Sequence, residues 1–336
     1  MRAVRLTELG GPEKLHGADV PKPEAGPGQI VVRVKRAAFN RRDVFITQNL
    51  YPGISLPRTL GSDACGVVDS IGEGVQGGAG GAPVVINPEL GWAGDGPLPD
   101  TSGDILGMPT DGTFAEFVVV PAANVYAKPA ALSDDEAAAI PLAGLTAYRA
   151  TFTRGKITKD DVVFIPGVGS GVQTFVLAYA KHVGARTVVT SGSDEKLERA
   201  KALGADVAIN YNTDADWHKT ARKAAGGAGP TLVVDSSGGD TLTKSIDIVA
   251  PGGRVVIYGG TRGDAKVRPF SIFWKHIDVL GTAMGSPSDF AAMLKLFETG
   301  VKPAIDRVFP MDDVVSAAER VLAGDQFGKV VLAIGE

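Results

Sequence analysis

The sequence predicts an α/β fold built around a doubly wound parallel sheet, in a chain long enough for about two domains. The chain has 336 residues, whereas a domain averages roughly 150. From about Asp160 onward, short apolar segments alternate with helical ones, starting with a strand at 162–165 and a helix at 172–183. Strands that alternate with helices at this spacing form βαβ units, and right-handed crossovers close such units into a doubly wound sheet.

The segment before this alternating region follows a different pattern. The first 125 residues are predicted to be rich in β-structure, because short apolar runs recur there between turns that contain Gly, Pro and Asp. These runs lie at 30–34, 65–71, 83–86 and 114–120. Residues 87–113 show no periodicity and are predicted to form a long surface loop.

The alternating region continues to about residue 258. It contains further predicted strands at 187–190, 207–209, 232–234 and 254–258 and helices at 195–203 and 241–249. The tail no longer keeps this rhythm and is predicted to contain helices at 289–299 and 312–323 and a last strand at 329–334.

The composition argues against several classes of protein. The chain has 34 basic and 38 acidic residues and a net charge of −4, so it lacks the basic excess of nucleic-acid-binding proteins. It contains no run of about 18 apolar residues, and residues 1–6 do not begin a signal peptide. The one cysteine, Cys65, excludes an intrachain disulfide and a multi-cysteine zinc cluster. We therefore expect a cytoplasmic protein that binds neither nucleic acid nor membranes.

A glycine-rich loop follows the strand at 162–165. Gly167, Gly169 and Gly171 stand between this strand and the next helix, where backbone N–H groups at a helix N-terminus bind a pyrophosphate. The spacing departs from G-x-G-x-x-G because Val172 takes the place of the last glycine. A purely structural turn is the alternative, but the strand–loop–helix context favours dinucleotide binding.

The end of the second strand of the alternating region distinguishes NAD from NADP. NAD sites place an acidic side chain there for the ribose 2′-hydroxyl, whereas NADP sites replace it with a cation. Here Ser191 and Ser193 are neutral hydroxyl donors, and Lys196 can reach a 2′-phosphate. Ser193 can also be an ordinary helix N-cap, and both roles are compatible. The sequence therefore favours NADP(H).

The chain resembles the medium-chain dehydrogenase/reductase family over essentially its full length. The motifs that carry this resemblance lie at 61–68, 169–172, 190–205, 250–254 and 328–332. The resemblance implies a GroES-like catalytic domain, formed by residues 1–125 and completed by residues 286–336, and an inserted Rossmann domain over residues 126–285. It also implies that the active site lies in the cleft between the two.

The loop, the strand end and the resemblance together give a set of predicted cofactor contacts. Within it, Tyr211 matches a tyrosine that covers the adenosine end, Lys329 is placed to reach a phosphate, and ordinary turn geometry is the alternative for the glycines. The set is Thr146, Gly167, Gly169, Ser170, Gly171, Val172, Ser191, Ser193, Lys196, Tyr211, Ser236, Gly238, Tyr258, Gly259, Gly260, Thr261 and Lys329.

The resemblance also predicts the absence of zinc. The positions that match the catalytic zinc ligands of the family's alcohol dehydrogenases are Asn40, Ser62 with Asp63, and Leu142, and these do not form a zinc-binding set. The loop at 87–106 has no cysteines for a structural zinc. The chain is similar to the zinc-free branch of quinone and enone reductases. This likeness implies hydride transfer from NADPH to a quinone or an α,β-unsaturated carbonyl compound, assisted by hydrogen-bond donors.

The candidate catalytic residues are those that the resemblance places near the nicotinamide. Three of them also have a structural alternative: Asp43 braces its loop, Asp63 holds Arg41 or Arg42, and Tyr51 is a loop aromatic. Two other functions stay open, namely a metal-free alcohol or carbonyl oxidoreductase and a catalytically silent nucleotide-binding regulator. The candidates are Asn40, Arg41, Asp43, Tyr51, Ser62 and Asp63.

Two further expectations concern the surface. The resemblance implies a homodimer formed by pairing of edge strands across a two-fold axis, with residues 279–284 as the candidate strand. The loop at 87–108 is expected to have a rim or interface role and to be anchored by Trp92.

Overall fold

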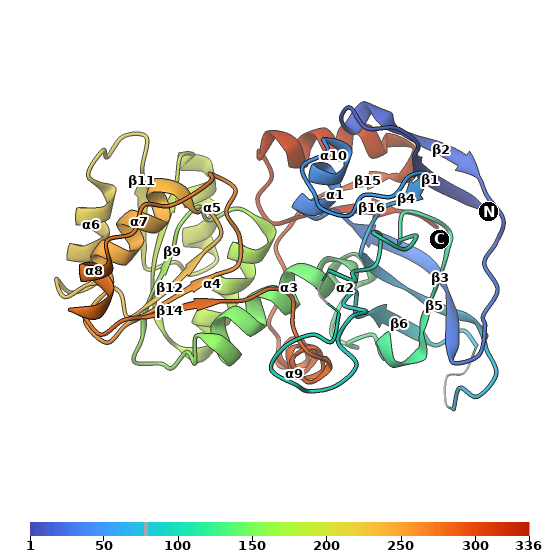
Figure 1. Cartoon of the computed structure of the whole chain (residues 1–336), viewed down its shortest axis with the longest axis horizontal. Helices are drawn as coiled ribbons and strands as arrows, with labels where there is room; N and C mark the ends of the chain where they lie inside the picture. The colour runs from blue at the N-terminus through green and yellow to red at the C-terminus, as the bar shows by residue number, and fades with distance from the viewer. Residues whose placement is uncertain (77–79, 102, 336) are drawn as a thin grey trace. The chain divides into compact units, whose positions relative to one another are not determined.

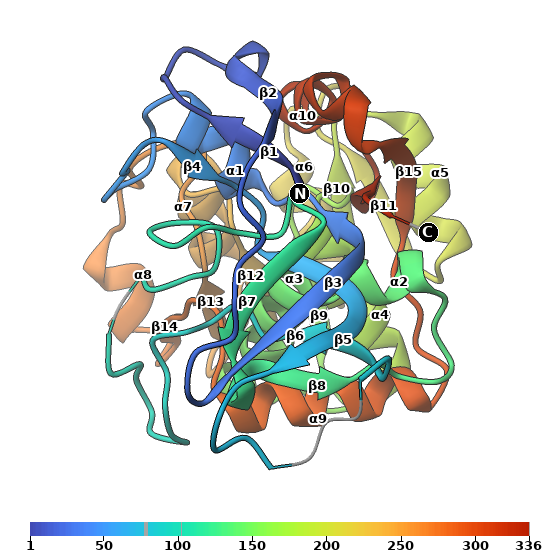
Figure 2. The same ribbon diagram turned by 90° about the vertical axis from the view of Figure 1, so that its right-hand side faces the viewer.

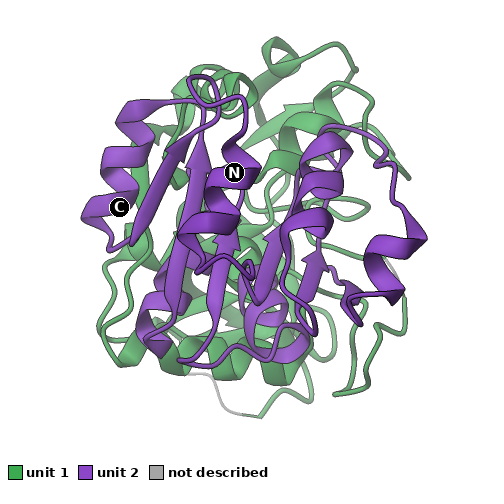
Figure 3. Cartoon of the chain, turned by 90° about the vertical axis from the view of Figure 1, so that its left-hand side faces the viewer, with its two compact units in different colours: residues 1–145, 285–336 green, residues 146–284 purple. Residues whose placement is uncertain are grey.

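The structure is a computed structural model that describes residues 1–76, 80–101 and 103–335. It forms two compact units (Figure 3): unit 1 comprises residues 1–145 and 285–336, and unit 2 comprises residues 146–284. The first boundary therefore lies later than the expected 125/126. Helix α2 (Asp134–Ala139) explains the difference, because it packs on four strands of unit 1 and Asp135 pairs with Arg36 there.

Unit 2 is built on a six-stranded parallel sheet in the order β11-β10-β9-β12-β13-β14 (Figure 1). The first strand of the unit thus lies in the middle and the chain winds outward in both directions, which confirms the predicted doubly wound fold. The strands are β9 (Val162–Ile165), β10 (Arg186–Ser191), β11 (Val207–Asn210), β12 (Leu232–Asp235), β13 (Arg254–Ile257) and β14 (Asp278–Gly281).

Helices follow most of these strands and cover both faces of the sheet, so the inner strands read as continuous apolar runs. They are α4 (Gly171–Val183), α5 (Asp194–Ala202), α6 (Trp217–Ala224), α7 (Gly239–Ile248) and α8 (Pro269–Phe273). Helix α4 ends at Gly184, which has φ +84°, a left-handed conformation that suits glycine. The crevice at the carboxyl ends of β9 and β12, where the winding reverses, is the usual ligand site of such a sheet.

Unit 1 contains a seven-stranded sheet, in which Figure 2 shows β3, β5 and β6 side by side. Its order is β15-β16-β3-β5-β6-β8, and β7 also pairs with β3. The strands are β3 (Gln29–Ala38), β5 (Asp63–Ile71), β6 (Pro83–Ile86), β7 (Phe117–Pro121), β8 (Val125–Ala127), β15 (Ile305–Pro310) and β16 (Lys329–Ala333). Because β16 pairs with β3, the C-terminal segment is part of the same sheet as the N-terminal strands.

A small sheet and several helices complete unit 1. The sheet has the order β2-β1-β4, with β1 (Arg2–Leu6), β2 (Leu15–Asp19) and β4 (Arg58–Thr59). The helices are α1 (Arg41–Thr47), α2, α9 (Pro287–Glu298) and α10 (Val314–Ala323). Helix α3 (Pro141–Tyr148) begins in unit 1, and the π-helical turn that follows it at Arg149–Arg154 belongs to unit 2. No helix in the described residues is long and apolar enough to cross a membrane.

The segment at 87–113 is only partly the surface loop that the sequence predicts. Its two ends are buried, with Glu89 and Trp92 at one end and Leu106 and Met108 at the other. The Trp92 indole donates a hydrogen bond to the carbonyl of Gly96 at 3.1 Å. The absence of periodicity therefore marks irregular backbone here, not exposure.

Candidate functional site

Three side chains of unit 1 meet at one edge of the large sheet because of the strand register. Lys329 begins β16, Asp63 begins β5, and Asn40 lies just past the end of β3, which runs between the other two. The pairs Val331↔Ala38 and Ala38↔Asp63 align these strand ends. Residues 289 positions apart in the chain, Asn40 and Lys329, are thereby brought into contact.

Asn40, Asp63 and Lys329 form a hydrogen-bonded set that we call the triad. The Lys329 ammonium donates to Asn40 Oδ1 at 2.7 Å and to Asp63 Oδ2 at 2.8 Å. The Asn40 amide donates to Asp63 Oδ2 at 3.0 Å, and the backbone N–H of Leu142 donates to Asp63 Oδ1 at 2.7 Å. All three side chains are buried. Hydrogen bonds to both oxygens of Asp63 offset the cost of burying this ion pair.

The triad retains two hydrogen-bond donors. An ammonium carries three protons and an amide two. In the described part of the chain, one proton of Lys329 and one of Asn40 have no acceptor. Two N–H donors, one of them on a cation, therefore stand next to each other in a site shielded from water. Such a pair can stabilise negative charge that develops on an oxygen atom.

Asp43 supports the triad from helix α1. Its Oδ2 accepts a hydrogen bond from the backbone N–H of Asn40 at 2.8 Å, so it braces the loop at the helix start. Burial raises the pKa of Asp43 to about 6, and the charge of Asp63 adds to that increase while Arg42 and Lys329 oppose it. Among the described residues, Asp43 Oδ1 is buried with no hydrogen-bond partner. The Asp43 carboxyl group can therefore both hold the loop that carries Asn40 and bind a proton near pH 6.

Arg42 organises a second cluster beside the triad. Its guanidinium donates to Ser62 Oγ at 2.7 Å, to the Leu106 carbonyl at 3.0 Å and to the Met108 carbonyl at 3.2 Å. The Tyr51 ring lies under the same guanidinium, with its centroid 4.9 Å from the central carbon. Ser62 in turn donates to the Leu106 carbonyl at 2.7 Å. Ser62 and Tyr51 are therefore partners of an arginine that the sequence analysis did not choose as a site residue.

The other arginine, Arg41, serves a different purpose. It donates to the carbonyls of Val321 and Leu322 in the last turn of α10, where a cation satisfies unpaired carbonyls. The alternative that Asp63 holds Arg41 or Arg42 is wrong, because the cation bound to Asp63 is Lys329.

Lys329 was expected to reach a phosphate of the cofactor, and the structure also gives it the triad contacts. The phosphate contact stays a prediction, which can use only the one ammonium proton outside the triad. The triad role was missed because it depends on strand register between the two ends of the chain. The signal in the sequence that could have indicated this role is a lysine, Lys329, at the start of the predicted last strand.

Glu89 is a further titratable group of unit 1 that sequence reasoning missed. It is buried at the start of the segment 87–108 and accepts a hydrogen bond from the backbone N–H of Gly91 at 3.1 Å. Burial raises its pKa to about 7, with Asp104 contributing in the same direction and Arg42 opposing. Glu89 lies between Pro88 and Leu90 in a segment without periodicity, so the sequence did not indicate that its side chain is buried.

In unit 2, the glycine loop joins β9 to the N-terminus of α4 as predicted. Gly167 and Gly169 have φ of +70° and +125°, so glycine is the residue that fits there. Ser170 is the N-cap and Gly171 the first residue of α4, and no atom lies within 4 Å of where a Cβ on Gly167 would stand. The helix N-terminus thus has open space in which an anion can approach.

Gln173 stands on the first turn of α4, just after Val172. Its amide donates to the carbonyls of Pro166 and Val234 at 3.2 and 2.9 Å. This buried side chain ties the ends of β9 and β12 together. It therefore fixes helix α4 on the sheet where a third glycine would allow close packing.

Two tight turns follow β12 and β13 at the same edge of the sheet. The Thr261 N–H donates to the Ser236 carbonyl at 3.2 Å. A Cβ on Gly238 would lie 2.6 Å from the Gly263 carbonyl, and one on Gly259 would lie 3.0 Å from the Ser236 carbonyl. Glycine is therefore needed for the two backbones to approach each other. The predicted residues Ser236, Gly238, Gly259, Gly260 and Thr261 lie together in these turns.

Asp235, at the end of β12, is a titratable group in these turns that the sequence analysis did not select. Its Oδ1 accepts the N–H groups of Ser237 and Gly238, whereas its Oδ2 is buried and unpartnered among the described residues. Burial raises its pKa, and the charge of Arg262 opposes that increase. Burial also raises the pKa of Tyr258, and the nearby hydroxyls of Ser236 and Ser170 oppose that increase. These polar groups are arranged at the usual ligand edge of the sheet.

The end of β10 carries hydroxyl side chains, Ser191 and, two residues later, Ser193. Ser191 Oγ accepts the N–H of Ser193, and Ser193 Oγ accepts the N–H of Lys196 at 3.3 Å, so Ser193 caps helix α5. The nearest carboxylate, Asp194, accepts a hydrogen bond from Asn210 at 2.7 Å.

A cation also lies near the end of β10. The guanidinium of Arg262 lies over the Tyr211 ring at 5.4 Å, and the Tyr211 N–H donates to the Ser191 carbonyl. Arg262 was not among the predicted contacts, because it comes from a turn far along the chain. Thr146, which was predicted, is buried and directs its hydroxyl to Met284 Sδ at 4.0 Å.

The residues at the family's zinc positions do not suit zinc. Ser62 is bound to Arg42 and to a carbonyl, Asn40 is bound to an ammonium, and Leu142 has no ligand atom in its side chain. Zinc sites in proteins use thiolate, imidazole and carboxylate ligands. No group of three such side chains could hold a metal ion within the described residues. The donor set therefore disagrees with zinc, and the cation present is Lys329.

Comparisons with known proteins agree with this architecture. A model of the alcohol dehydrogenase GroES-like domain matches residues 26–130, and a zinc-binding dehydrogenase model matches residues 171–299. The chain is 35% identical over 333 residues to the zinc-type alcohol dehydrogenase-like protein YogA of Leptosphaeria maculans, covering 94% of this chain and 93% of that protein. It is 27% identical over 344 residues to the quinone oxidoreductase of Homo sapiens, covering 99% and 98%. A solved structure of an NAD-dependent alcohol dehydrogenase is 39% identical, with a TM-score of 0.92 and full coverage of both chains.

Proposed function

The chain belongs to the medium-chain dehydrogenase/reductase family of oxidoreductases, and we propose that it is an NADP(H)-dependent reductase of quinones or α,β-unsaturated carbonyl compounds that uses no zinc. The observation that carries this proposal is the triad. Where zinc-type members have metal ligands, this chain has a buried ammonium held by an amide and a carboxylate.

The triad replaces the charge of a metal but not its other chemistry. When bound, reduced nicotinamide supplies the hydride that adds to an electron-poor acceptor. The N–H groups of Lys329 and Asn40 hydrogen-bond the acceptor oxygen as negative charge develops on it. Asp63 holds the ammonium in place through the 2.8 Å ion pair, and Asp43 fixes the loop that carries Asn40.

The triad contains no Lewis acid, and this determines which class of acceptor it suits. Oxidation of an ordinary alcohol at neutral pH is helped by a Lewis acid that lowers the pKa of the hydroxyl, and an ammonium does this poorly. A conjugated acceptor needs only stabilisation of an enolate or hydroquinone oxygen, followed by protonation from Lys329 or from solvent. A quinone or an enone therefore suits these residues better than a simple alcohol does.

The preference for NADP(H) rests on the end of β10. It offers the hydroxyls of Ser191 and Ser193 and the cations Lys196 and Arg262, while Asp194 is engaged by Asn210. A 2′-phosphate requires cations and no carboxylate at this point. Because one similar structure is of an NAD-dependent enzyme, NADH is the necessary comparison in every assay.

The experiment that tests this function is a panel of initial rates. Oxidation of NADPH and of NADH is followed with a small quinone, an enone and an aldehyde, and NADP⁺ reduction is followed with an alcohol. The proposal expects turnover with the quinone or the enone and NADPH. Faster turnover of the aldehyde or alcohol would favour a metal-free carbonyl oxidoreductase. Cofactor binding with no turnover in any assay would favour a silent nucleotide-binding protein.

The homodimer stays part of the proposal. The last strand of the unit 2 sheet, β14, is shorter than the predicted 279–284 and ends at Gly281, but it is an edge strand with Val279 40% exposed. An exposed apolar edge pairs readily with a second copy of itself. Light scattering that gives a mass near 34.7 kDa at every concentration would contradict this pairing.

A further inference from the structure

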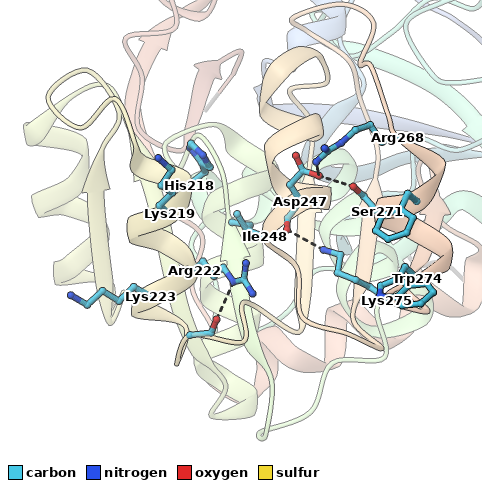
Figure 4. Close-up of a pocket in the computed structure, with 12 residues that line it drawn as sticks. His218, Lys219, Arg222, Lys223, Asp247, Ile248, Arg268, Ser271, Trp274 and Lys275 are labelled. Carbon is cyan, nitrogen blue, oxygen red and sulfur yellow. Dashed lines mark hydrogen bonds and ion pairs between the residues drawn. The ribbon is translucent and has the colours of Figure 1, made fainter.

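Unit 2 has a pocket of about 770 Å³ between helices α6 and α8, which we call the α6–α8 pocket (Figure 4). Its volume falls in the range of small-molecule sites, about 300–1,000 Å³. One wall is formed by α6 and carries His218, Lys219 and Arg222. The opposite wall is formed by α8 and the residues after it, where Figure 4 labels Trp274. Phe270 also lies on α8 and lines this wall.

The α6–α8 pocket is strongly basic in a chain with a net charge of −4. Its lining contains one carboxylate, Asp247, which is already bound by Arg268 at 3.0 Å and by the Ser271 hydroxyl at 2.8 Å. Five Lys or Arg residues line it: Lys219, Arg222, Lys223, Arg268 and Lys275. The lining therefore has an excess of positive charge that attracts an anion.

Two pKa values agree with this excess. Burial lowers the pKa of His218, and the charges of Lys244 and Lys219 lower it further while Asp216 and Asp247 oppose. Burial also lowers the pKa of Lys275, and Arg222 contributes in the same direction against Asp247. An anion in the pocket would oppose both decreases, so His218 can report its binding.

The aromatic wall is exposed to solvent. Phe270 is 58% exposed and Trp274 is 68% exposed, and their rings stack with centroids 5.4 Å apart and an angle of 14° between the planes. Large exposed aromatic groups rimmed by polar residues often mark a binding site. A flat ring of a ligand can extend this stack while its charged group reaches the cations of α6.

The α6–α8 pocket is distinct from the dinucleotide site. Helix α7 begins at Gly239, beside the turn that contains Gly238, and its other end, at Asp247 and Ile248, lines the pocket. Since α7 has 10 residues, the two sites are separated by about 15 Å along this helix. A cofactor at the glycine loop therefore leaves the pocket free.

We propose that the α6–α8 pocket binds a second ligand, an aromatic ring that carries phosphate, of the nucleotide class. The cations of α6 bind the phosphate, and Trp274 with Phe270 stacks on the ring. We expect the ring and the anion both to contribute, because the exposed aromatic rings belong to the α8 side, whereas three of the five cations, Lys219, Arg222 and Lys223, belong to α6.

The test is calorimetric titration of adenosine monophosphate into the full-length protein saturated with NADPH, or with NADH if that is the cofactor it binds. Trp274→Ala removes the stacking wall and Arg222→Ala removes a central cation, and Lys159→Ala removes an exposed lysine elsewhere in unit 2. We expect each pocket variant to weaken binding at least about tenfold, because Trp274→Ala loses a stacked base and Arg222→Ala loses a hydrogen bond to a charged group. Lys159→Ala should bind as the wild type does, and all three should keep wild-type oxidoreductase activity.

Three further readouts decide the outcome. Adenosine alone and inorganic phosphate alone should each bind more weakly than adenosine monophosphate, and adenosine monophosphate should raise the pKa of His218 measured by NMR. Absence of binding, or binding that Trp274→Ala and Arg222→Ala leave unchanged, would overturn the proposal. So would a shift of oligomeric state in Trp274→Ala without any nucleotide binding, because the aromatic wall would then be an interface between copies of the chain.

Discussion

The ammonium of Lys329 lies 2.8 Å from the carboxylate of Asp63, and both side chains are almost completely buried. The two residues come from strands on either side of β3. A buried ion pair of this kind adds little stability relative to apolar residues, but an unpaired member is costly. Because Asp63 lies at a position that matches a zinc ligand of the family, we propose that the pair also has a chemical role.

Loss of one member should therefore destabilise the fold. Lys329→Met leaves Asp63 buried without its cation, and we expect the free energy of unfolding to fall by about 3–5 kcal/mol. Urea denaturation measures this change. The control is Lys201→Met, which breaks the exposed pair between Lys201 and Glu198 and should change stability by less than about 1 kcal/mol. Equal decreases in the free energy of unfolding for the two substitutions would show that loss of the buried pair costs no more than loss of the exposed one.

Asn40 should matter more for turnover than for cofactor binding. Asn40→Ala removes one donor to the acceptor oxygen, and loss of such a donor typically lowers kcat about 10²–10³-fold. An enone should suffer more than a quinone, since the quinone is intrinsically more electrophilic. Steady-state kinetics and NADPH titration separate the two effects. A decrease of less than about threefold for both acceptors, under ~0.7 kcal/mol of barrier, would make Asn40 a packing residue.

Asp43 should make stability depend on pH. Burial raises its pKa from 3.8 to about 6, so the folded state holds this proton more tightly than the unfolded state. Its contribution is full below pH 4 and is lost as the pH rises through about 6, a change of about 3 kcal/mol. Asp43→Asn should remove that loss, so the variant should gain stability relative to the wild type between pH 4 and pH 7.

Glu89 titrates in the same range, with a pKa raised to about 7. Because it is present in both proteins, the difference between wild type and Asp43→Asn isolates Asp43. Parallel stability curves over this pH range would mean that Asp43 keeps an ordinary pKa.

Lys196 should distinguish the two cofactors. Lys196→Ala is expected to weaken NADPH by about 1–3 kcal/mol, the value of a charged hydrogen bond, and to leave NADH almost unchanged. Fluorescence titration of both cofactors measures this. Ser191→Asp, which restores an acidic residue at the end of β10, should weaken NADPH and strengthen NADH. Equal losses of both cofactors in Lys196→Ala would show that this lysine does not contact the 2′-phosphate.

The sequence predicted the parts of this structure that depend on local pattern. The strands of unit 2, the glycine loop and the N-cap at Ser193 each follow from a few neighbouring residues. The compact units divide the chain at 145/146 instead of the expected 125/126, because residues 126–145 have no pattern that assigns them to either domain. Their place in unit 1 depends on packing of α2 against distant strands.

The triad shows the limit of the sequence for the site. Asn40 and Asp63 were recognised as candidates, but the identity of the cation beside them depends on the pairing of β16 with β3. Arg41 and Arg42 were equally reasonable from the sequence, since both follow Asn40 directly. The register between β3 and β16, which lie far apart in the chain, depends on the packing of the whole domain. It cannot be predicted from a local sequence pattern.

We propose that Lys329 takes the place of zinc, and the zinc content of the active enzyme decides whether it does. Elemental analysis on purified protein, with turnover of the best acceptor measured before and after a strong chelator, gives moles of zinc per active chain. We expect far less than one zinc per chain and the same rate after chelation. One tightly bound zinc per chain, with activity that is lost on chelation and restored by added zinc, would contradict it.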